Sequence, residues 1–463
     1  MMTAFQPSPS VFRSINPTTE QLVREYPAHD ASEVESLIEL AGAAFALWRS
    51  LGIAGRAPFI SRTAQVLRAR RAELARLMTE EMGKPIAAAE AEVDKCAGCC
   101  DYFAGKASEF LADELIASDA GRSYVRCDPL GAVLAIMPWN FPLWQVVRFA
   151  APALMAGNVG LLKHAPNVPG CALAIESALR EAGIPPGVFT SLMIDTPAVE
   201  AVIRDPVVRA VTLTGSERAG MAVAQQAGKA LKKAVLELGG SDAFIVLKDA
   251  DVAAVAKAAA DARCINSGQS CIAAKRFIVE RPLAGEFETA FAAALASLVV
   301  GDPVDRATQL GPLARQDLLD NLADQVQRSI AAGARLVVGG RRLPGKGYFY
   351  PPTLLADVRP GNPAFDEETF GPVAALVIAE DADEAVRLAN ASKYGLGSSI
   401  WTRDTALAER LAGQIDAGCV FINGPVKSDS RLPFGGVKHS GYGRELSLAG
   451  IREFVNLKTV WVK

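Results

Sequence analysis

The stretch from Pro129 to Lys163 reads PLGAVLAIMPWNFPLWQVVRFAAPALMAGNVGLLK. The 19 residues from Pro129 to Val147 carry no charge, and after Arg148 another 14 uncharged residues follow. Length and hydropathy alone would allow a membrane span. Prolines and asparagines, however, divide the stretch into pieces of strand and helix length, which is typical of a buried parallel sheet with covering helices. We expect a strand at 132–137, a helix at 143–156 and a strand at 159–163.

The same alternation continues along the chain and predicts an α/β fold built from βαβ units. The first series goes on with strands at 188–194 and 210–213 and with helices at 170–183 and 217–231. A second series has strands near 275–280, 373–379, 397–402 and 418–422. Because a single core rarely grows beyond ~250 to 300 residues, a chain of 463 residues with two such series indicates two main domains.

Composition argues for a small-molecule partner. The net charge of -3, with both signs interspersed, provides no basic surface for nucleic acid, and the broken apolar stretch predicts no membrane span. Three clustered cysteines, Cys96, Cys99 and Cys100, have no second CxxC beside them, and the three histidines are scattered. We therefore expect no metal site and reduced thiols in a cytoplasmic protein. Residues 1–14 lack a signal-peptide pattern and are expected to form a short flexible arm.

Candidate catalytic residues come from three separate motifs. Cys271 ends the run Asn266-Ser267-Gly268-Gln269-Ser270-Cys271, where small and amide residues would leave a thiol among hydrogen-bond donors. Asn140 could donate to an oxyanion. Glu237 lies between two leucines at the end of an apolar strand, where desolvation would raise its pKa. Taken singly, such a cysteine is usually an inert core residue and such a glutamate a strand-end charge.

Seven motifs in the same order make the chain resemble the aldehyde dehydrogenase superfamily nearly end to end. They are Glu81-Met82-Gly83-Lys84-Pro85, Pro138-Trp139-Asn140-Phe141-Pro142, Thr214-Gly215-Ser216, Glu237-Leu238-Gly239-Gly240, Gly268-Gln269-Ser270-Cys271, Glu367-Glu368-Thr369-Phe370-Gly371-Pro372 and Pro433-Phe434-Gly435-Gly436-Val437-Lys438.

The resemblance implies a Rossmann-like dinucleotide-binding domain (1–108 and 130–238), an α/β catalytic domain (239–445) and a β-ribbon oligomerisation flap (109–129 and 446–463). Two segments with period-two alternation, 123–126 and 454–462, suit the ribbon. The implied assembly is a homodimer or homotetramer.

The resemblance also implies a reaction in which Cys271 attacks an aldehyde, Asn140 and the Cys271 N–H stabilise the oxyanion, and Glu237 activates water to hydrolyse the thioester. Two other classes stay open from the residues alone. One is a noncatalytic protein that keeps the fold, which the intact Cys271, Asn140 and Glu237 disfavour. The other is a cysteine hydrolase without a nicotinamide, which the scarcity of histidine disfavours.

No Gly-x-Gly-x-x-Gly follows the early strands, so sequence pattern alone leaves the cofactor open. Thr214-Gly215-Ser216 ends a strand and opens a helix, which by itself is an ordinary N-cap that could also bind an anion. The resemblance implies NADP or NAD, with pyrophosphate near Ser216, riboses at Lys163 and Glu368, and the nicotinamide beside Phe370. The remaining implied contacts are Met137, Pro138, Trp139, Asn140, His164, Pro166, Gly215 and Leu238.

NADP is slightly favoured over NAD. Relatives that prefer NAD commonly carry a glutamate three positions after the strand-end lysine, and this chain has Pro166 there. Without that carboxylate, and with Lys163 and His164 nearby, a 2'-phosphate should be tolerated.

Arg148 predicts the substrate class. In succinate-semialdehyde dehydrogenases, which residues 137–169 especially resemble, an arginine at this position holds the distal carboxylate of the aldehyde, and Trp144 would share its helix face. Many relatives have a second arginine where this chain has Ile265. Arg263 could replace it if turned inward, and Lys427 and Ser428 could assist. Other short ω-semialdehyde acids, such as glutarate semialdehyde, and uncharged aldehydes remain open, and so does a structural role for Arg148 in an interdomain ion pair.

Overall fold

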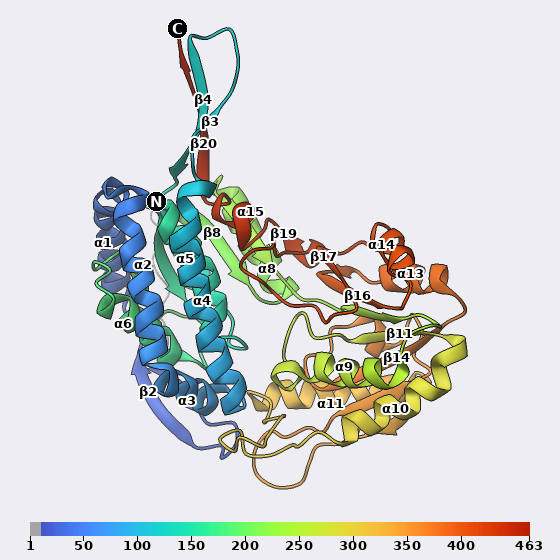
Figure 1. Ribbon diagram of the computed structural model, residues 1–463. Coiled ribbons are helices and arrows are strands. Elements are labelled where there is room, and N and C mark those ends of the chain that lie inside the picture. The colour runs from blue at the N-terminus through green and yellow to red at the C-terminus, as the bar shows by residue number, and fades with distance from the viewer. Residues whose placement is uncertain (1–10) are drawn as a thin grey trace.

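The computed structural model describes residues 11–463, which form two large sheets, each packed against helices, and a narrow ribbon that projects from them (Figure 1). The predicted α/β class is therefore confirmed. Within these residues no single helix is long and apolar enough to cross a membrane; α1 (Ala31–Ser50) and α2 (Gly52–Ala69) reach that length and composition only as a pair bent by 113°.

The first sheet has the strand order β19-β9-β8-β5-β6-β7, with parallel pairing throughout except between β19 and β9. Its strands are β5 (Ala132–Ile136), β6 (Val159–Lys163), β7 (Phe189–Ser191), β8 (Val208–Thr214), β9 (Lys233–Glu237) and β19 (Gly441–Tyr442). Strand β19 belongs to the segment expected in the catalytic domain, so the C-terminal part of the chain completes the edge of the first sheet.

Helices surround this sheet. They are α1 (Ala31–Ser50), α2 (Gly52–Ala69), α3 (Arg71–Met82), α4 (Ile86–Phe110), α5 (Trp144–Ala156), α6 (Pro169–Glu181), α7 (Val199–Arg204) and α8 (Glu217–Lys229). Every residue of α5 is buried, and the helix packs against α4 and β6 (Figure 1). The opening stretch of sequence is thus the unit β5-α5-β6, as its uncharged pieces predict. Burial on all sides explains why its apolar pattern shows no amphipathic period.

The second sheet has the order β12-β13-β14-β11-β10-β16-β17 and is parallel except for the edge pair β12 and β13. Its strands are β10 (Ala243–Val246), β11 (Arg276–Glu280), β12 (Arg335–Val338), β13 (Thr353–Ala356), β14 (Val373–Ala379), β16 (Gly397–Trp401) and β17 (Cys419–Ile422). The helices of this part are α9 (Val252–Cys264), α10 (Ala284–Ala296), α11 (Gln316–Ala331), α12 (Pro363–Asp366), α13 (Ala382–Asn390), α14 (Thr405–Ala412) and α15 (Ser447–Ile451).

The projecting ribbon consists of β3 (Glu114–Leu115), β4 (Arg122–Pro129) and β20 (Val455–Val462) (Figure 1). Strands β4 and β20 pair antiparallel along their full length, as their period-two alternation predicts. Leu457 and Trp461, both at least half exposed, lie on its surface.

Short elements complete the chain. They are the hairpin β1 (Val11–Ile15) and β2 (Leu22–Pro27), the pair β15 (Tyr394–Gly395) and β18 (Val437–Lys438), and the 3-10 turns Ile265–Gly268 and Arg281–Leu283. The hairpin corrects the expected flexible arm at residues 1–14. Residues 1–10 lie outside the described residues, but residues 11–14 form an ordered strand in which Ser14 is fully buried.

Candidate active site

The loop that carries Cys271 has an unusual backbone. After α9 ends at Cys264, the three residues Asn266, Ser267 and Gly268 all have left-handed dihedrals, with φ of 52°, 56° and 75°. A Cβ on Gly268 would lie 2.3 Å from the carbonyl carbon of Gly371, so only glycine fits there. Non-glycine residues adopt this conformation at a cost, which the surrounding structure must offset. The loop therefore holds Cys271 in one fixed position.

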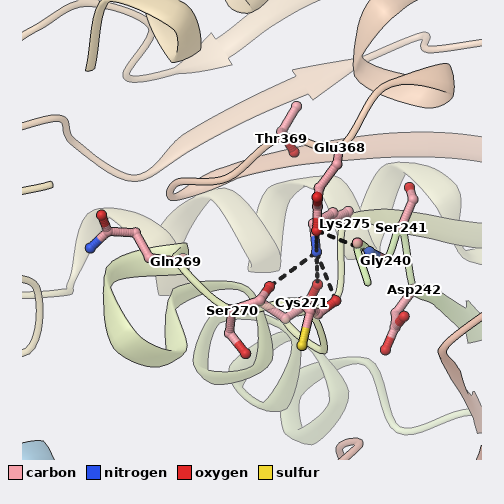
Figure 2. Close-up of polar contacts among 12 residues, drawn as sticks. Gly240, Ser241, Asp242, Gln269, Ser270, Cys271, Lys275, Glu368 and Thr369 are labelled. Carbon is pink, nitrogen blue, oxygen red and sulfur yellow. Dashed lines mark hydrogen bonds and ion pairs between the residues drawn. The ribbon is translucent and has the colours of Figure 1, made fainter. Parts of the chain in front are cut away.

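A buried lysine binds the backbone of this loop through hydrogen bonds. Lys275 is 1% exposed, and its ammonium group donates to the carbonyl oxygens of Ser270 (3.1 Å), Cys271 (3.0 Å) and Ala273 (3.1 Å). Figure 2 shows these bonds, with the sulfur of Cys271 pointing away from the lysine. Glu368, 3.9 Å from the ammonium nitrogen, supplies the counter-charge and accepts from the N–H of Gly240 at 2.9 Å. Burial lowers the pKa of Lys275 to about 8.

Sequence reasoning missed Lys275. Its signal was a charge four residues after the cysteine, directly before the fully buried strand β11. A charge at such a place needs buried partners, which here are the backbone carbonyls of the nucleophile loop and Glu368.

The side chain of Asn140 is fixed beside the same loop. Its Nδ2 donates to the carbonyl of Gln269 at 3.0 Å, and its Oδ1 accepts from Gln145 Nε2 at 3.2 Å. Asn266 donates to the Asn140 carbonyl at 2.7 Å. Because an amide nitrogen carries two hydrogens, one N–H of Asn140 is left to donate to a reacting oxygen. The structure thus brings Asn140 to the Cys271 loop.

The thiol of Cys271 is protonated in this resting arrangement. Burial raises its pKa to about 12, and the positive charges of Arg148 and Lys275 oppose that rise. Cys271 nevertheless keeps partial exposure, because it lines the cleft described below. A group that accepts the thiol proton is therefore needed before or during attack.

Glu237 ends β9 as a desolvated carboxyl group. Its side chain is 2% exposed, and among the described residues neither of its carboxyl oxygens has a hydrogen-bond partner. Burial raises its pKa well above the usual value, the negative charge of Glu445 adds to the rise, and Arg148 opposes it. The raised pKa agrees with what the flanking leucines predict. A carboxylate in such a place is a stronger base than one in water.

Arg148 lies inside the protein and already has an anionic neighbour. It forms an ion pair with Glu445, both residues being 5% exposed or less, and donates to Thr214 Oγ1 at 3.1 Å. The guanidinium carbon also lies 5.1 Å from the centre of the Phe434 ring. The ion pair joins α5 to the segment before α15, so the structural role weighed from the sequence is present. A role in substrate binding remains a prediction.

The Glu81-Met82-Gly83-Lys84-Pro85 motif helps to fix the start of α5. Lys84 forms a fully buried ion pair with Glu92, and Glu92 accepts from the backbone N–H groups of Leu143 (3.0 Å) and Trp144 (2.9 Å). These N–H groups belong to the first turn of α5, where a carboxylate is favoured by the helix dipole. The motif therefore positions the helix that carries Arg148.

A cleft of about 400 Å³ opens onto Cys271. Most of the residues predicted to contact the cofactor line it, and these are Pro138, Trp139, Asn140, Gly215, Ser216, Leu238, Glu368 and Phe370. Phe370 packs edge-on against Trp139 with ring centres 5.8 Å apart. Sequence reasoning missed Arg315, Leu318 and Asn321, which α11 and the residue before it add to the wall.

The cleft suits a nucleotide. Ser216 caps α8 by accepting from the Ala219 N–H at 3.3 Å, and Gly215 leaves open space, since an added Cβ would meet only Leu213 at 3.6 Å. A helix N-terminus with an adjacent glycine is a suitable place for a pyrophosphate. The guanidinium of Arg315, 5.8 Å from the centre of the Trp139 ring, lies at the cleft and is paired with Asp317 at 2.8 Å.

The remaining predicted cofactor contacts are Met137, Lys163, His164 and Pro166, and His164 requires a correction. Its Nδ1 accepts from the Ala165 N–H at 2.8 Å, and its Nε2 lies 2.9 Å from the Pro142 carbonyl. Burial lowers its pKa to about 4, so the ring is neutral and offers no charge to a 2'-phosphate. Burial also lowers the pKa of Lys163, whereas Pro166 is exposed at the start of the following loop. Met137 is buried beside Lys163, to whose carbonyl it donates at 3.0 Å.

Besides Arg148, the predicted substrate residues differ in whether a substrate could reach them. Trp144 and Ser428 lie on the same side of the molecule, linked by Lys95, whereas Lys427 is exposed. Arg263 did turn inward, but it is fully buried and donates to the carbonyls of Gly268 (2.8 Å) and Val373 (3.3 Å). This position corrects its proposed role, because a guanidinium sealed beneath the loop cannot reach a substrate.

The cysteines of the Cys96-Cys99-Cys100 cluster are buried core residues of α4 whose pKa values are raised by burial. Within residues 11–463, no group of three or more His, Cys, Asp or Glu side chains could hold a metal ion. All eight cysteines are free thiols.

Fold and site together are those of a nucleotide-binding α/β enzyme: Cys271 and Asn140 line one cleft, and the desolvated Glu237 ends β9 directly before Leu238, which lines the same cleft. Comparison with known proteins identifies the class further: the profile of the Aldehyde dehydrogenase family matches residues 5–460, and the chain belongs to this family. The probable NADP+-dependent succinate-semialdehyde dehydrogenase of Synechocystis is 51% identical over 97% of this chain and 99% of its own. The NAD(P)+-dependent succinate semialdehyde dehydrogenase Sad of Escherichia coli is 50% identical over 97% of each chain.

Solved structures agree. The crystal structure of succinic semialdehyde dehydrogenase from Streptococcus pyogenes in complex with NADP+ superposes with a TM-score of 0.96 at 38% identity, and the match covers 97% of this chain and 99% of that one. An NADP-dependent enzyme of Escherichia coli superposes with a TM-score of 0.95 at 33% identity, over 97% of this chain and 94% of that one.

Proposed function

We propose that this enzyme oxidises succinate semialdehyde to succinate with NADP+ or NAD+. The observation that carries the proposal is identity of 50% to 51% with succinate-semialdehyde dehydrogenases over nearly the whole chain. The site adds a physical reason. The guanidinium of Arg148 is the positive charge with the largest effect on the pKa of the Cys271 thiol, so a cation lies close to the reacting group; Glu445 pairs with it, and a substrate carboxylate would have to share it.

The proposed reaction begins with attack of Cys271 Sγ on the aldehyde carbon, while the thiol proton passes to water in the cleft. The side-chain N–H of Asn140 and the N–H of Cys271 donate to the oxyanion that forms. A nicotinamide cofactor held in the cleft would supply the chemistry of hydride acceptance from the substrate carbon. A thioester then remains on Cys271. Glu237, once ionised, takes a proton from a water molecule that attacks the thioester carbon, which releases the acid and restores the thiol.

Residues at the cleft would hold the cofactor on this proposal. The amino end of α8 with Ser216 suits the pyrophosphate, Glu368 the nicotinamide ribose, and the Trp139 and Phe370 side the nicotinamide itself. NADP+ keeps its slight preference because Pro166 brings no carboxylate and the relatives named above use NADP+ or either cofactor. His164 does not contribute to this preference, because its ring is neutral.

We further propose a homodimer or homotetramer held by the ribbon of β3, β4 and β20, whose exposed Leu457 and Trp461 would be covered on assembly. A cytoplasmic location is proposed from the eight free thiols. Neither proposal affects the assignment of the reaction.

Initial rates of nucleotide reduction at 340 nm test the function. The enzyme is assayed with succinate semialdehyde and with butanal, an uncharged aldehyde of equal chain length, and with NADP+ and NAD+ separately. We expect a kcat/KM at least tenfold higher for the acid. Equal values for the two aldehydes would refute the substrate assignment, and the absence of nucleotide reduction with either would refute the enzyme.

A further inference from the structure

Lys95 on α4 contacts two of the predicted substrate residues, Trp144 and Ser428, and has no role in the reaction proposed above. Its ammonium group donates to Ser428 Oγ at 2.7 Å and lies 4.1 Å from the centre of the Trp144 ring. Trp144 begins α5, the helix that carries Arg148, and α4 packs directly against α5 (Figure 1). The three side chains thus bring together segments that are 333 residues apart in the chain.

The ammonium group of Lys95 has no anionic partner. Among the described residues, no carboxylate lies within 4.0 Å of it. The two acids nearest in sequence are engaged elsewhere, because Glu92 pairs with Lys84 and caps α5, and Asp94 pairs with Arg71 at 2.9 Å. An ammonium has three donors, and a hydroxyl and an indole face do not neutralise its charge.

A second cation acts on Lys95 at the same place. Burial lowers the pKa of Lys95 to about 8, and the positive charge of Arg148 is the next cause. The carboxylate of Glu92, also on α4, opposes this shift. Arg148 is balanced by Glu445, which leaves Lys95 as the uncompensated cation. Lys95 also retains solvent-exposed surface, so a ligand that enters from solvent can reach it.

An uncompensated ammonium beside a hydroxyl and an indole is suited to a small carboxylate. The carboxylate would supply the missing negative charge, accept from the ammonium and from Ser428 Oγ, and place its methylene carbons against Trp144. Neither Arg263, sealed beneath the nucleophile loop, nor Ile265 can provide this charge.

We propose that Lys95, together with Ser428 and Trp144, binds the distal carboxylate of the semialdehyde and acts as the second cation beside Arg148. The proposal rests on the proposed function, because it requires an aldehyde that carries a carboxylate. The competing view is that Lys95 only braces the Ser428 segment against α4. If Lys95 binds the carboxylate, its substitution should impair the acid substrate alone, whereas the loss of a brace should impair charged and uncharged aldehydes equally.

The test compares the ratio of kcat/KM for succinate semialdehyde to that for butanal in several variants of the full-length enzyme. Lys95→Met removes the charge, Lys95→Gln keeps a polar side chain in case the first variant folds poorly, and Lys95→Arg keeps the charge. Lys106→Met is the matched control, since Lys106 lies on the same helix but is exposed and paired with Glu109.

Loss of one charge-assisted hydrogen bond predicts a fall in the ratio of about 10- to 100-fold for Lys95→Met and Lys95→Gln, mostly through a higher KM for the acid. Lys95→Arg should recover most of the ratio, and Lys106→Met should leave it at the wild-type value. A ratio unchanged in Lys95→Met, or equal losses for both aldehydes, would overturn the proposal while the wild-type preference still supported the function. A wild-type enzyme without preference for the acid would overturn both.

Discussion

Replacement of Arg148 by methionine should leave Glu445 as a buried carboxylate without a partner. Arg148 and Glu445 are 3% and 5% exposed, and among the described residues no other cation forms an ion pair with Glu445. Removal of one member of a buried pair typically costs about 3 to 5 kcal/mol. With an unfolding entropy near 2.1 cal/mol/K per residue, a chain of 463 residues loses about 1 °C in Tm per kcal/mol, so we expect a fall of about 3 to 5 °C.

The loss should depend on pH in a defined direction. Burial raises the pKa of Glu445 above its ordinary value of 4.5, and Arg148 opposes that rise. Without Arg148 the folded state binds the Glu445 proton more tightly than the unfolded state. Stability should therefore be close to that of the wild type near pH 4.5 and fall as the pH rises toward the raised pKa.

The assay is thermal unfolding of the wild type, Arg148→Met, Glu445→Gln and the double variant at pH 6 and pH 8.5. The double variant carries no stranded charge, so it should unfold at a higher temperature than Arg148→Met, with the larger difference at pH 8.5. If Arg148→Met and the double variant unfold together at both pH values, the reasoning about the buried pair is wrong.

Two further predictions concern the nucleophile loop. Lys275→Met removes three hydrogen bonds to the backbone around Cys271. Because small displacements of reacting groups lower rates about 100-fold, kcat should fall by about that factor, whereas the circular dichroism spectrum should stay that of the wild type. An unchanged kcat would show that the loop keeps its shape without Lys275. Alkylation of Cys271 by iodoacetamide, followed by peptide mass spectrometry without cofactor, should accelerate about tenfold per pH unit from pH 7 to 9, since the pKa of the thiol is raised to about 12; a plateau near pH 8 would contradict this.

Much of the fold could be predicted from local pattern. Strands that are buried on both faces form uninterrupted apolar runs, which is why the bounds of β5, β6, β14 and β16 lie within a residue or so of the expected ranges. The strands of the ribbon followed from period-two alternation, and their pairing into one ribbon from the family resemblance. Local pattern did not reveal contacts between distant segments. Examples are the pairing of β19 with β9, some 200 residues apart, and the packing of α1 on β6 and of α2 and α4 on α5.

The residues of the candidate site also divide into those that local sequence pattern could identify and those that it could not. Cys271, Asn140 and Glu237 were predicted because their motifs, each with a chemical reason, occur together in the order that the family resemblance requires; their catalytic roles remain predictions. His164 and Arg263 were assigned from position along the chain. Arg263 proved to be fully buried, and burial leaves His164 a neutral ring engaged with backbone groups, which no local pattern reports. Lys95 and Lys275 were missed for the converse reason. Only the folded chain shows that Lys275 has backbone carbonyl partners in the nucleophile loop and that Lys95 contacts Ser428 and has no carboxylate partner.

The central claim is that Cys271 carries the acyl group and Glu237 directs its hydrolysis. The most direct measurement is mass spectrometry of Glu237→Gln after mixing with succinate semialdehyde and NADP+, with Cys271→Ala as control. We expect one equivalent of rapid nucleotide reduction and a succinyl adduct on Cys271 in Glu237→Gln, and neither in Cys271→Ala. Full steady-state turnover by Glu237→Gln, or an adduct on any other residue, would contradict the account.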